Sequence, residues 1–176
     1  MGGSYEGLHY VHTAYIGVGS NIGDKAGNCR KAIRAIDSCE GCVVEAESPL
    51  YETEPVHLES QDWFVNGVVR IRTDLEPETL FARLKAIEHA MGSRPREVRF
   101  GPRILDLDIV FYDDSILRTK LLQIPHPRLH QRRFVLRPLC NLAPELVHPV
   151  LGHTIQSLLS NLEDGGKRVT LYRCDS

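Results

Sequence analysis

Two aspartates, Asp106 and Asp108, have the clearest chemical potential in this sequence. They stand two residues apart in the apolar stretch LDLDIVFY, which is typical of a strand. Side chains two apart on a strand point to the same face, so the two carboxylates must lie close together. Like charges at this separation repel unless a cation lies between them, and an oxygen-only pair suits a hard ion such as Mg²⁺. The alternative is an ordinary solvated strand face.

Arginine is concentrated around this pair. Nine of the sixteen arginines lie between residues 94 and 137, and Arg99 and Arg103 come just before the aspartates. Guanidinium groups are well suited to binding phosphate oxygens. The pattern therefore predicts a site for a small polyanion. The whole chain has a formal net charge of −2, which gives no reason to expect a nucleic-acid or anionic-membrane partner.

The segment IPHPRLHQRRF adds further basic side chains downstream. His126 and His130 are four residues apart, but Pro127 argues against a helical metal-binding face through them. We therefore favour phosphate contact by Arg132 over a histidine metal site.

Aromatic residues could hold a flat ring near these charges. Phe134 follows the arginine cluster, and Phe64 lies in a predicted strand with Asn66 on the same strand face. These three side chains could bind a heteroaromatic ligand, although Phe64 alone would more often be a core residue. Lys85 and Glu88, three apart on one face of a predicted helix, could be no more than a surface salt bridge worth ~0.5 kcal/mol.

The glycines of GVGSNIG fit a dinucleotide-binding turn poorly. Gly17, Gly19 and Gly23 are spaced G-x-G-x-x-x-G, and Asp37 falls inside a predicted helix instead of at the end of a second strand. A P-loop sequence is also missing from the chain. Any nucleotide must be held in another way.

The elements that position these residues follow the order β-α-β-β-α-β. Short β-prone runs predict strands at 12–18, 43–51, 64–72 and 105–112. Two apolar helical patterns lie between them: the first begins near Asp24 and is closed by Gly41, and the second is capped by Asp74 and ends at Gly92. This order predicts an α+β protein with a ferredoxin-like βαββαβ core, an antiparallel sheet with two helices on one face.

Further elements are predicted after this core. Residues 116–124 could pair back as an additional strand, helices are expected at 134–142 and 154–162, and a short terminal strand is expected at 169–172. We therefore expect additional C-terminal helices and a strand beside the ferredoxin-like core.

Length and composition limit the class of protein. A chain of 176 residues, 42% hydrophobic and 25% charged, is typical of one globular domain, which we place at residues 13–176 after a leader or linker at 1–12. No window approaches the ~18 apolar residues of a membrane span, and the N-terminus lacks the features of a signal peptide. Five irregularly spaced cysteines favour a reduced compartment. We expect a cytoplasmic protein.

Taken together, these residues resemble the 6-hydroxymethyl-7,8-dihydropterin pyrophosphokinase family over residues 15–171. The family signature is basic-x-G-P-R-x-x-D-hydrophobic-D-hydrophobic-hydrophobic, and residues 99–110 satisfy it at every position. Supporting landmarks occur in family order: G-S-N at 19–21, Y-x-T at 51–53, F-x-N at 64–66, I-E at 87–88 and P-H-P at 125–127.

The resemblance implies transfer of the terminal pyrophosphate of ATP to the hydroxymethyl group of the pterin, with release of AMP, in folate biosynthesis. It implies two Mg²⁺ ions bound by Asp106 and Asp108, and catalytic roles for these two residues with Arg99 and Arg103. ATP contacts are implied for Lys85, Glu88, Arg94, Arg96, Arg103, Ile109, His126 and Arg132. Pterin contacts are implied for Thr53, Val56, Phe64, Asn66, Phe100 and Phe134.

The resemblance further implies a mobile catalytic loop at 93–99, where the sequence departs from the family. Ser93 and Pro95 replace basic residues of many relatives, and Leu121 stands where some relatives have a basic nucleotide contact. The family occurs alone and fused to other folate enzymes, so we expect a monomer or part of such a fusion. Its partners would be ATP and the dihydropterin, with no nucleic acid or membrane.

The competing hypothesis is a non-catalytic ferredoxin-like RNA-binding module that uses RPREVRF as a basic, aromatic-bearing surface. Such a module would bind with strong salt dependence and would lack a defined metal site. The net charge and the missing aromatic strands of RNA-binding folds count against this alternative.

Overall fold

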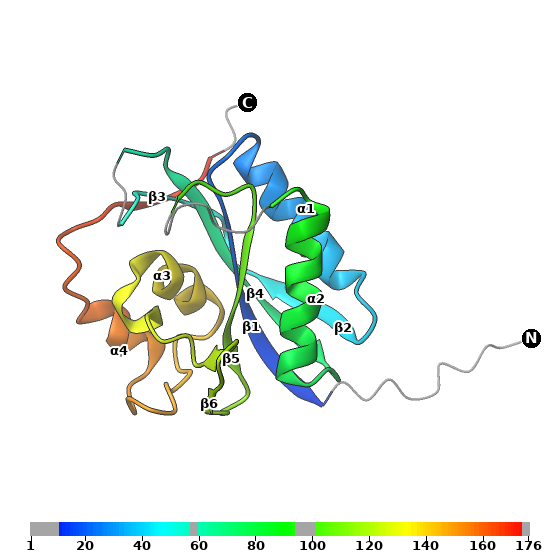
Figure 1. The fold of residues 1–176 in the computed structure, drawn as a ribbon. Coiled ribbons are helices and arrows are strands. Elements are labelled where there is room, and N and C mark those ends of the chain that lie inside the picture. Colours follow the sequence, from blue (N-terminus) through cyan, green and yellow to red (C-terminus); the bar gives the residue numbers. More distant parts are fainter. Residues whose placement is uncertain (1–10, 57–59, 94–100, 174–176) are drawn as a thin grey trace, which may run out of the picture.

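The computed structural model describes residues 11–56, 60–93 and 101–173, and its framework is an antiparallel sheet. The sheet has six strands in the order β5-β1-β4-β3-β8, with β2 also paired to β4. Helices cover both of its faces (Figure 1). The strands of the sheet are β1 His12–Ser20, β2 Cys42–Glu47, β3 Tyr51–Thr53, β4 Phe64–Thr73, β5 Asp106–Tyr112 and β8 Val169–Leu171. The predicted ferredoxin-like α+β fold is confirmed.

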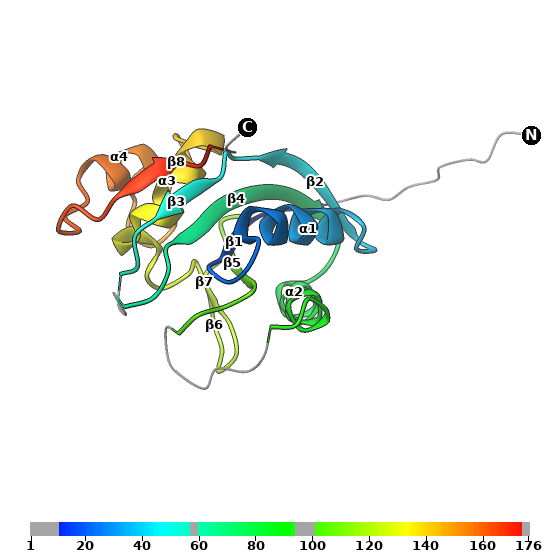
Figure 2. The same cartoon turned by 90° about the horizontal axis from the view of Figure 1, so that it is seen from above.

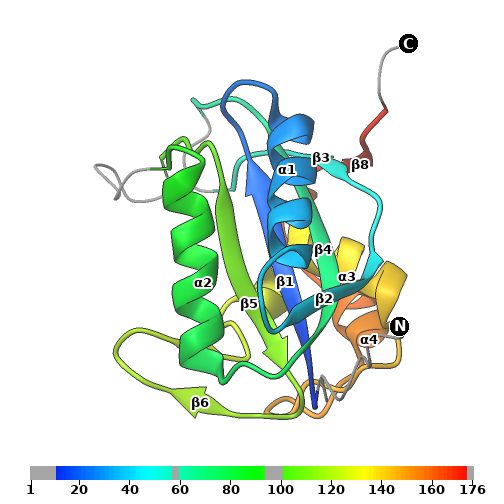
Figure 3. The ribbon, with the colours of Figure 1, turned by 90° about the vertical axis from the view of Figure 1, so that its right-hand side faces the viewer.

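Helices α1 (Lys25–Asp37) and α2 (Pro77–Ala90) lie side by side on one face of the sheet (Figure 3). The side chain of Asp24 caps α1, as predicted, by accepting a hydrogen bond from the Gly27 amide at 2.9 Å. The predicted cap of α2 at Asp74 is wrong. Since a proline is favoured in the first helical turn, Pro77 fixes the start of the helix and makes Glu76 the capping residue.

The apolar faces of α1 and α2 close the larger core. Its buried side chains from α1 are Ala26, Cys29, Ala32, Ile33 and Ile36. Leu80 and Leu84 contribute the buried face of α2. Gly92, with φ of +88°, follows the last turn of α2 and ends the helix as predicted.

The opposite face of the sheet carries α3 (Arg133–Leu142) and α4 (Ile155–Ser160), which follow a 3-10 turn at Leu129–Gln131 (Figure 2). A second apolar cluster joins these helices to the sheet: Tyr15, Val68, Val110, Phe111, Leu129, Leu136, Leu139 and Ile155. The two helices match the predicted segments 134–142 and 154–162, and β8 matches the predicted terminal strand. Within the described residues, no helix is long and apolar enough to cross a membrane.

Two strand predictions are wrong. The predicted strand 43–51 is divided into β2 and β3, since Ser48 bonds Val68 through both its amide and its hydroxyl and Pro49 has no amide hydrogen to donate. Residues 116–124 do not extend the main sheet. They form a separate hairpin of β6 (Leu117–Arg118) and β7 (Gln123–Ile124), closed by hydrogen bonds between Thr119 and Leu122.

Strand β5 separates its side chains between the two faces. Leu107 and Ile109 are buried in the core with α1 and α2, so Asp106 and Asp108 point toward the side of α3. A register shift against β1 then changes the alternation, and Val110 and Phe111 both join the second cluster. The predicted shared face of the two aspartates is confirmed.

Candidate active site

A cleft of about 270 Å³ opens between the sheet and the beginning of α3. It gathers residues that are far apart in the sequence, from β1, β4, β5 and the segments that follow β3 and β7. The predicted site residues that line it are Thr53, Val56, Phe64, Asn66, Arg103, Asp106, Asp108, His126, Arg132 and Phe134.

Two glycines of β1 form the floor of this cleft. Gly17 lies opposite Asp108, while Gly19 lies opposite Asp106 on one side and Asn66 on the other. A Cβ atom on Gly19 would approach Oδ1 of Asn66 to 2.5 Å. The glycines therefore leave the centre of the sheet open between the two aspartates of β5 and Asn66 of β4. Sequence reasoning missed this role, although glycine inside a β-prone run was the signal that could have found it.

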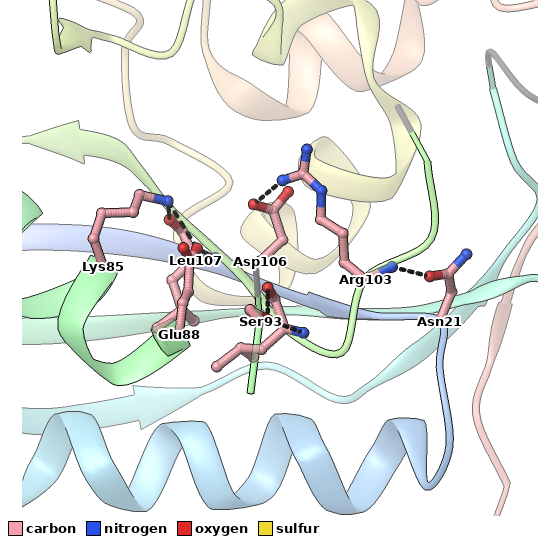
Figure 4. Close-up of polar contacts among 8 residues, drawn as sticks. Asn21, Lys85, Glu88, Ser93, Arg103, Asp106 and Leu107 are labelled. Carbon is pink, nitrogen blue, oxygen red and sulfur yellow. Dashed lines mark hydrogen bonds and ion pairs between the residues drawn. The ribbon is translucent and has the colours of Figure 1, made fainter. Parts of the chain in front are cut away.

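The two aspartates line one side of the cleft. Arg103 donates from Nη1 to Oδ1 of Asp106 at 2.5 Å (Figure 4). Burial raises the pKa of Asp106, the charge of Asp108 raises it further, and Arg103 opposes both effects. A further cation beside Asp106 would therefore favour its ionised form.

The donor set fits Mg²⁺. Two carboxylates from one strand supply hard oxygen ligands, and among the described residues there is no group of three or more metal-ligating side chains. Mg²⁺ is usually bound in this way, through one or two carboxylates together with substrate phosphates and water.

Lys85 and Glu88 are more than a surface salt bridge. Lys85 Nζ lies 2.7 Å from Glu88 Oε1 and donates to the Leu107 carbonyl at 2.8 Å, and Glu88 Oε1 accepts from the Leu107 amide at 2.6 Å (Figure 4). Burial raises the pKa of Glu88, with Lys85 opposing the shift. The pair thus satisfies both backbone groups of the residue between the two aspartates.

His126 and Arg132 also line the cleft. Burial lowers the pKa of His126 to about 4, and the charge of Arg132 lowers it further, so the imidazole is neutral at pH 7. His126 Nδ1 accepts from the Arg128 amide at 3.2 Å. The guanidinium of Arg132 lies 5.5 Å from the centre of the Phe134 ring. Arg132 therefore connects the charged part of the cleft to its aromatic part.

The other end of the cleft is aromatic and amide-rich. Phe64 and Phe134 both line it, so Phe64 is not a core residue. Asn66 is 9% exposed and donates from Nδ2 to the Thr53 hydroxyl at 2.6 Å. This bond fixes the orientation of the Asn66 amide, whose remaining polar positions are available to a ligand.

The remaining predicted residues occupy different places. Ile109 is 2% exposed and is buried in the core on the other face of β5, away from the cleft lining. Leu121 is 79% exposed in the β6–β7 hairpin. Ser93 bonds Leu105 twice, donating to its carbonyl at 2.8 Å and accepting from its amide at 2.9 Å (Figure 4). The predicted loop residues Arg94, Pro95, Arg96, Arg99 and Phe100 lie outside the described residues.

Fold and site define a class: a ferredoxin-like α+β protein that carries a carboxylate and arginine cleft beside an aromatic pocket on the open part of its sheet. Residues 15–144 match the model of the family described as 7,8-dihydro-6-hydroxymethylpterin-pyrophosphokinase. The chain belongs to this family, and the resemblance stated from the sequence is confirmed.

Relatives of known name support this assignment. The 2-amino-4-hydroxy-6-hydroxymethyldihydropteridine pyrophosphokinase of Methylorubrum extorquens is 40% identical over 87% of this chain and 95% of its own length. The folic acid synthesis protein fol1 of Schizosaccharomyces pombe is 44% identical over 89% of this chain and 21% of its own length. The chain spans about a fifth of the length of fol1 and of two similar folic acid synthesis proteins.

Solved structures agree on the fold. Wild-type HPPK-DHPS of Plasmodium falciparum with pteroate has a TM-score of 0.69 and 17% identity, over 85% of this chain and 42% of that one. The A437G variant with STZ-DHP also has a TM-score of 0.69 and 17% identity, over 85% of this chain and 45% of that one.

Proposed function

We propose that this protein transfers the terminal pyrophosphate of ATP to the hydroxymethyl group of 6-hydroxymethyl-7,8-dihydropterin, with release of AMP, in folate biosynthesis. The observation that carries the proposal is the cleft itself. In a chain of the pyrophosphokinase family, one cleft holds paired carboxylates with arginines at one end and an oriented amide with two phenylalanines at the other.

The carboxylate end suits the triphosphate of ATP. Asp106 and Asp108 would hold Mg²⁺, which when bound neutralises phosphate charge, and the family resemblance implies two such ions. Arg103 and Arg132 line the same end and would bind phosphate oxygens through their guanidinium groups. A neutral His126 can contact the nucleotide without adding charge.

Other nucleotide contacts in the proposal rest on the resemblance. Lys85 and Glu88 already bond the backbone between the two aspartates, so they would also support the metal ligands. The side chain of Ile109 is buried, so a nucleotide contact there would use its backbone. Arg94, Arg96, Arg99 and Phe100 enter the proposal through the resemblance alone.

The amide and aromatic end suits the pterin. Asn66 presents donor and acceptor positions fixed by Thr53, which match the alternating donors and acceptors on the edge of a pterin ring. Phe64 and Phe134 would stack on the two faces of the ring. Thr53 and Val56 would add backbone contacts, as the resemblance implies.

The reaction then needs positioning more than covalent chemistry. The hydroxymethyl oxygen attacks the β-phosphorus, and the bond from that phosphorus to the oxygen shared with the α-phosphate breaks. AMP leaves, and the proton of the hydroxyl group passes to a phosphate oxygen. In-line alignment and charge neutralisation by arginine supply the catalysis, without a side-chain nucleophile.

We also propose that residues 13–176 act as one pyrophosphokinase domain in the cytoplasm, either as a monomer or joined to other folate enzymes. The relatives support both arrangements. The Methylorubrum extorquens relative is covered over 95% of its length, and the Schizosaccharomyces pombe protein over 21%.

The experiment is incubation of the protein with ATP, Mg²⁺ and 6-hydroxymethyl-7,8-dihydropterin, with nucleotide products separated by chromatography. We expect AMP, in an amount equal to the pterin diphosphate, and loss of the reaction on addition of EDTA. Asp108→Asn should lose at least ~10²-fold of the turnover, while Asp114→Asn, in the exposed turn after the same strand, should keep wild-type turnover. Failure to form AMP at saturating concentrations of both substrates would overturn the proposal.

A further inference from the structure

Asn21 lies immediately after β1 and bonds chain segments that lead into the cleft. It is 2% exposed, and its backbone amide, side-chain oxygen and side-chain nitrogen all have hydrogen-bond partners. A buried amide bonded on every side holds its partners in one arrangement, because moving any of them leaves a buried polar group unpaired. The partners of Asn21 therefore show which chain segments it holds in place.

On one side Asn21 holds the backbone of Arg103. The Arg103 amide donates to Asn21 Oδ1 at 2.7 Å (Figure 4). The Asn21 amide in turn donates to the Arg103 carbonyl at 3.0 Å. The side chain of Arg103 lines the cleft and bonds Asp106. These two hydrogen bonds hold the backbone of Arg103 in place, and with it the point from which its side chain extends toward the phosphate end.

On the other side Asn21 holds the chain that leads into β4. Its Nδ2 donates to Gln61 Oε1 at 3.0 Å and to the Asp62 carbonyl at 3.2 Å. Gln61 lines the cleft, and Phe64 and Asn66 follow within five residues. One buried amide group therefore bonds the segment of the phosphate end and the segment of the pterin end.

We propose that Asn21 is a positioning residue, which sets the phosphate end and the pterin end of the cleft relative to each other without contacting the reacting atoms. The inference rests on the proposed function, because alignment of the pterin hydroxyl with the β-phosphorus is what this arrangement would serve. A small change in such alignment has a large effect on rate, since the reacting groups must be held near their attack geometry.

The structure offers a matched control for a merely structural role. Asn28 bonds the same turn, donating from Nδ2 to the Ile22 carbonyl at 2.9 Å and to the Ser20 hydroxyl at 3.2 Å. Neither of these two bonds reaches a residue that lines the cleft. Asn28→Ala therefore removes turn stability while leaving the contacts of Asn21 in place.

The test compares wild type, Asn21→Ala and Asn28→Ala in the complete chain, at a temperature well below the unfolding midpoint of each. We expect both variants to lose thermal midpoint, with Asn21→Ala losing at least as much as Asn28→Ala. Asn21→Ala alone should lower kcat at least tenfold and raise KM for ATP and for the pterin. If Asn21→Ala does not fold, Asn21→Ser, whose hydroxyl can keep one partner, should show the same changes at smaller size.

The outcomes separate the two proposals. If wild type forms no AMP, the proposed function fails and this inference fails with it. If wild type is active and the folded Asn21 variant has the kcat and both KM values of Asn28→Ala, the positioning role alone is overturned.

Discussion

Lys85 and Glu88 bond the carbonyl and the amide of Leu107 on the outer side of the edge strand β5. Removing the pair should therefore lower the free energy of unfolding more than removing a surface salt bridge would. Strand β5 ends the sheet, so the amide and carbonyl of Leu107 need partners outside it. In Glu88→Ala the Leu107 amide loses its acceptor in a place where the Glu88 side chain is 14% exposed. An unpaired buried amide costs ~1–3 kcal/mol, so we expect a loss of about 2 kcal/mol in the free energy of unfolding.

Urea unfolding measures this loss. The control is Glu78→Ala, in the exposed first turn of the same helix, which should cost less than about 1 kcal/mol. Glu88→Gln keeps an acceptor for the Leu107 amide and should lose less than Glu88→Ala. If Glu88→Ala costs no more than Glu78→Ala, then the bonds to Leu107 contribute nothing and our description of the pair is incorrect.

Three further predictions concern the cleft. Asp108→Asn should reduce turnover at least ~10²-fold, because the variant loses a ligand for the metal ion. Its unfolding midpoint should stay the same or rise, because one of two repelling carboxylates is neutralised. If the variant is instead unfolded at the assay temperature, so that lost folding accounts for the lost turnover, the metal-binding role is contradicted. Phe134→Ala should weaken pterin binding about tenfold and nucleotide binding less, as measured by titration, and equal weakening would contradict stacking on the pterin. His126 has a pKa near 4 in the folded protein, against an ordinary 6.5, so the unfolded state takes up a proton first as the pH falls. Stability should therefore fall by up to about 3 kcal/mol between pH 6.5 and 4, and urea unfolding of His126→Gln should lack this part of the fall; an unchanged slope would contradict the assignment.

Local signals in the sequence were sufficient for most of the framework. The Asp24 cap, the apolar face of α1 and the glycine after α2 each depend on residues close by in the sequence, so short-range patterns predict them correctly. The shared face of Asp106 and Asp108 follows in the same way from the period of a strand.

Features that depend on distant partners were not predictable. The break at Ser48 requires Val68, twenty residues away in the sequence. The function of Lys85 and Glu88 depends on the free edge of β5, which the helix sequence does not reveal.

The role of Gly19 in the floor of the cleft also could not be predicted from the sequence. The sequence places Gly19 in a glycine pattern that resembles a nucleotide-binding turn, and that pattern does not show which strands lie beside it. In the sheet it lies between Asp106 and Asn66, two residues from different strands, and the value of a missing side chain becomes visible only there.

The fate of labelled phosphate tests the central claim most directly. The protein is incubated with Mg²⁺ and the dihydropterin, once with ATP labelled at the α-phosphate and once with ATP labelled at the γ-phosphate. We predict that the α label is recovered in AMP and the γ label in the pterin diphosphate. Recovery of the α label in the pterin product, or of ADP as the nucleotide product, would contradict attack at the β-phosphorus.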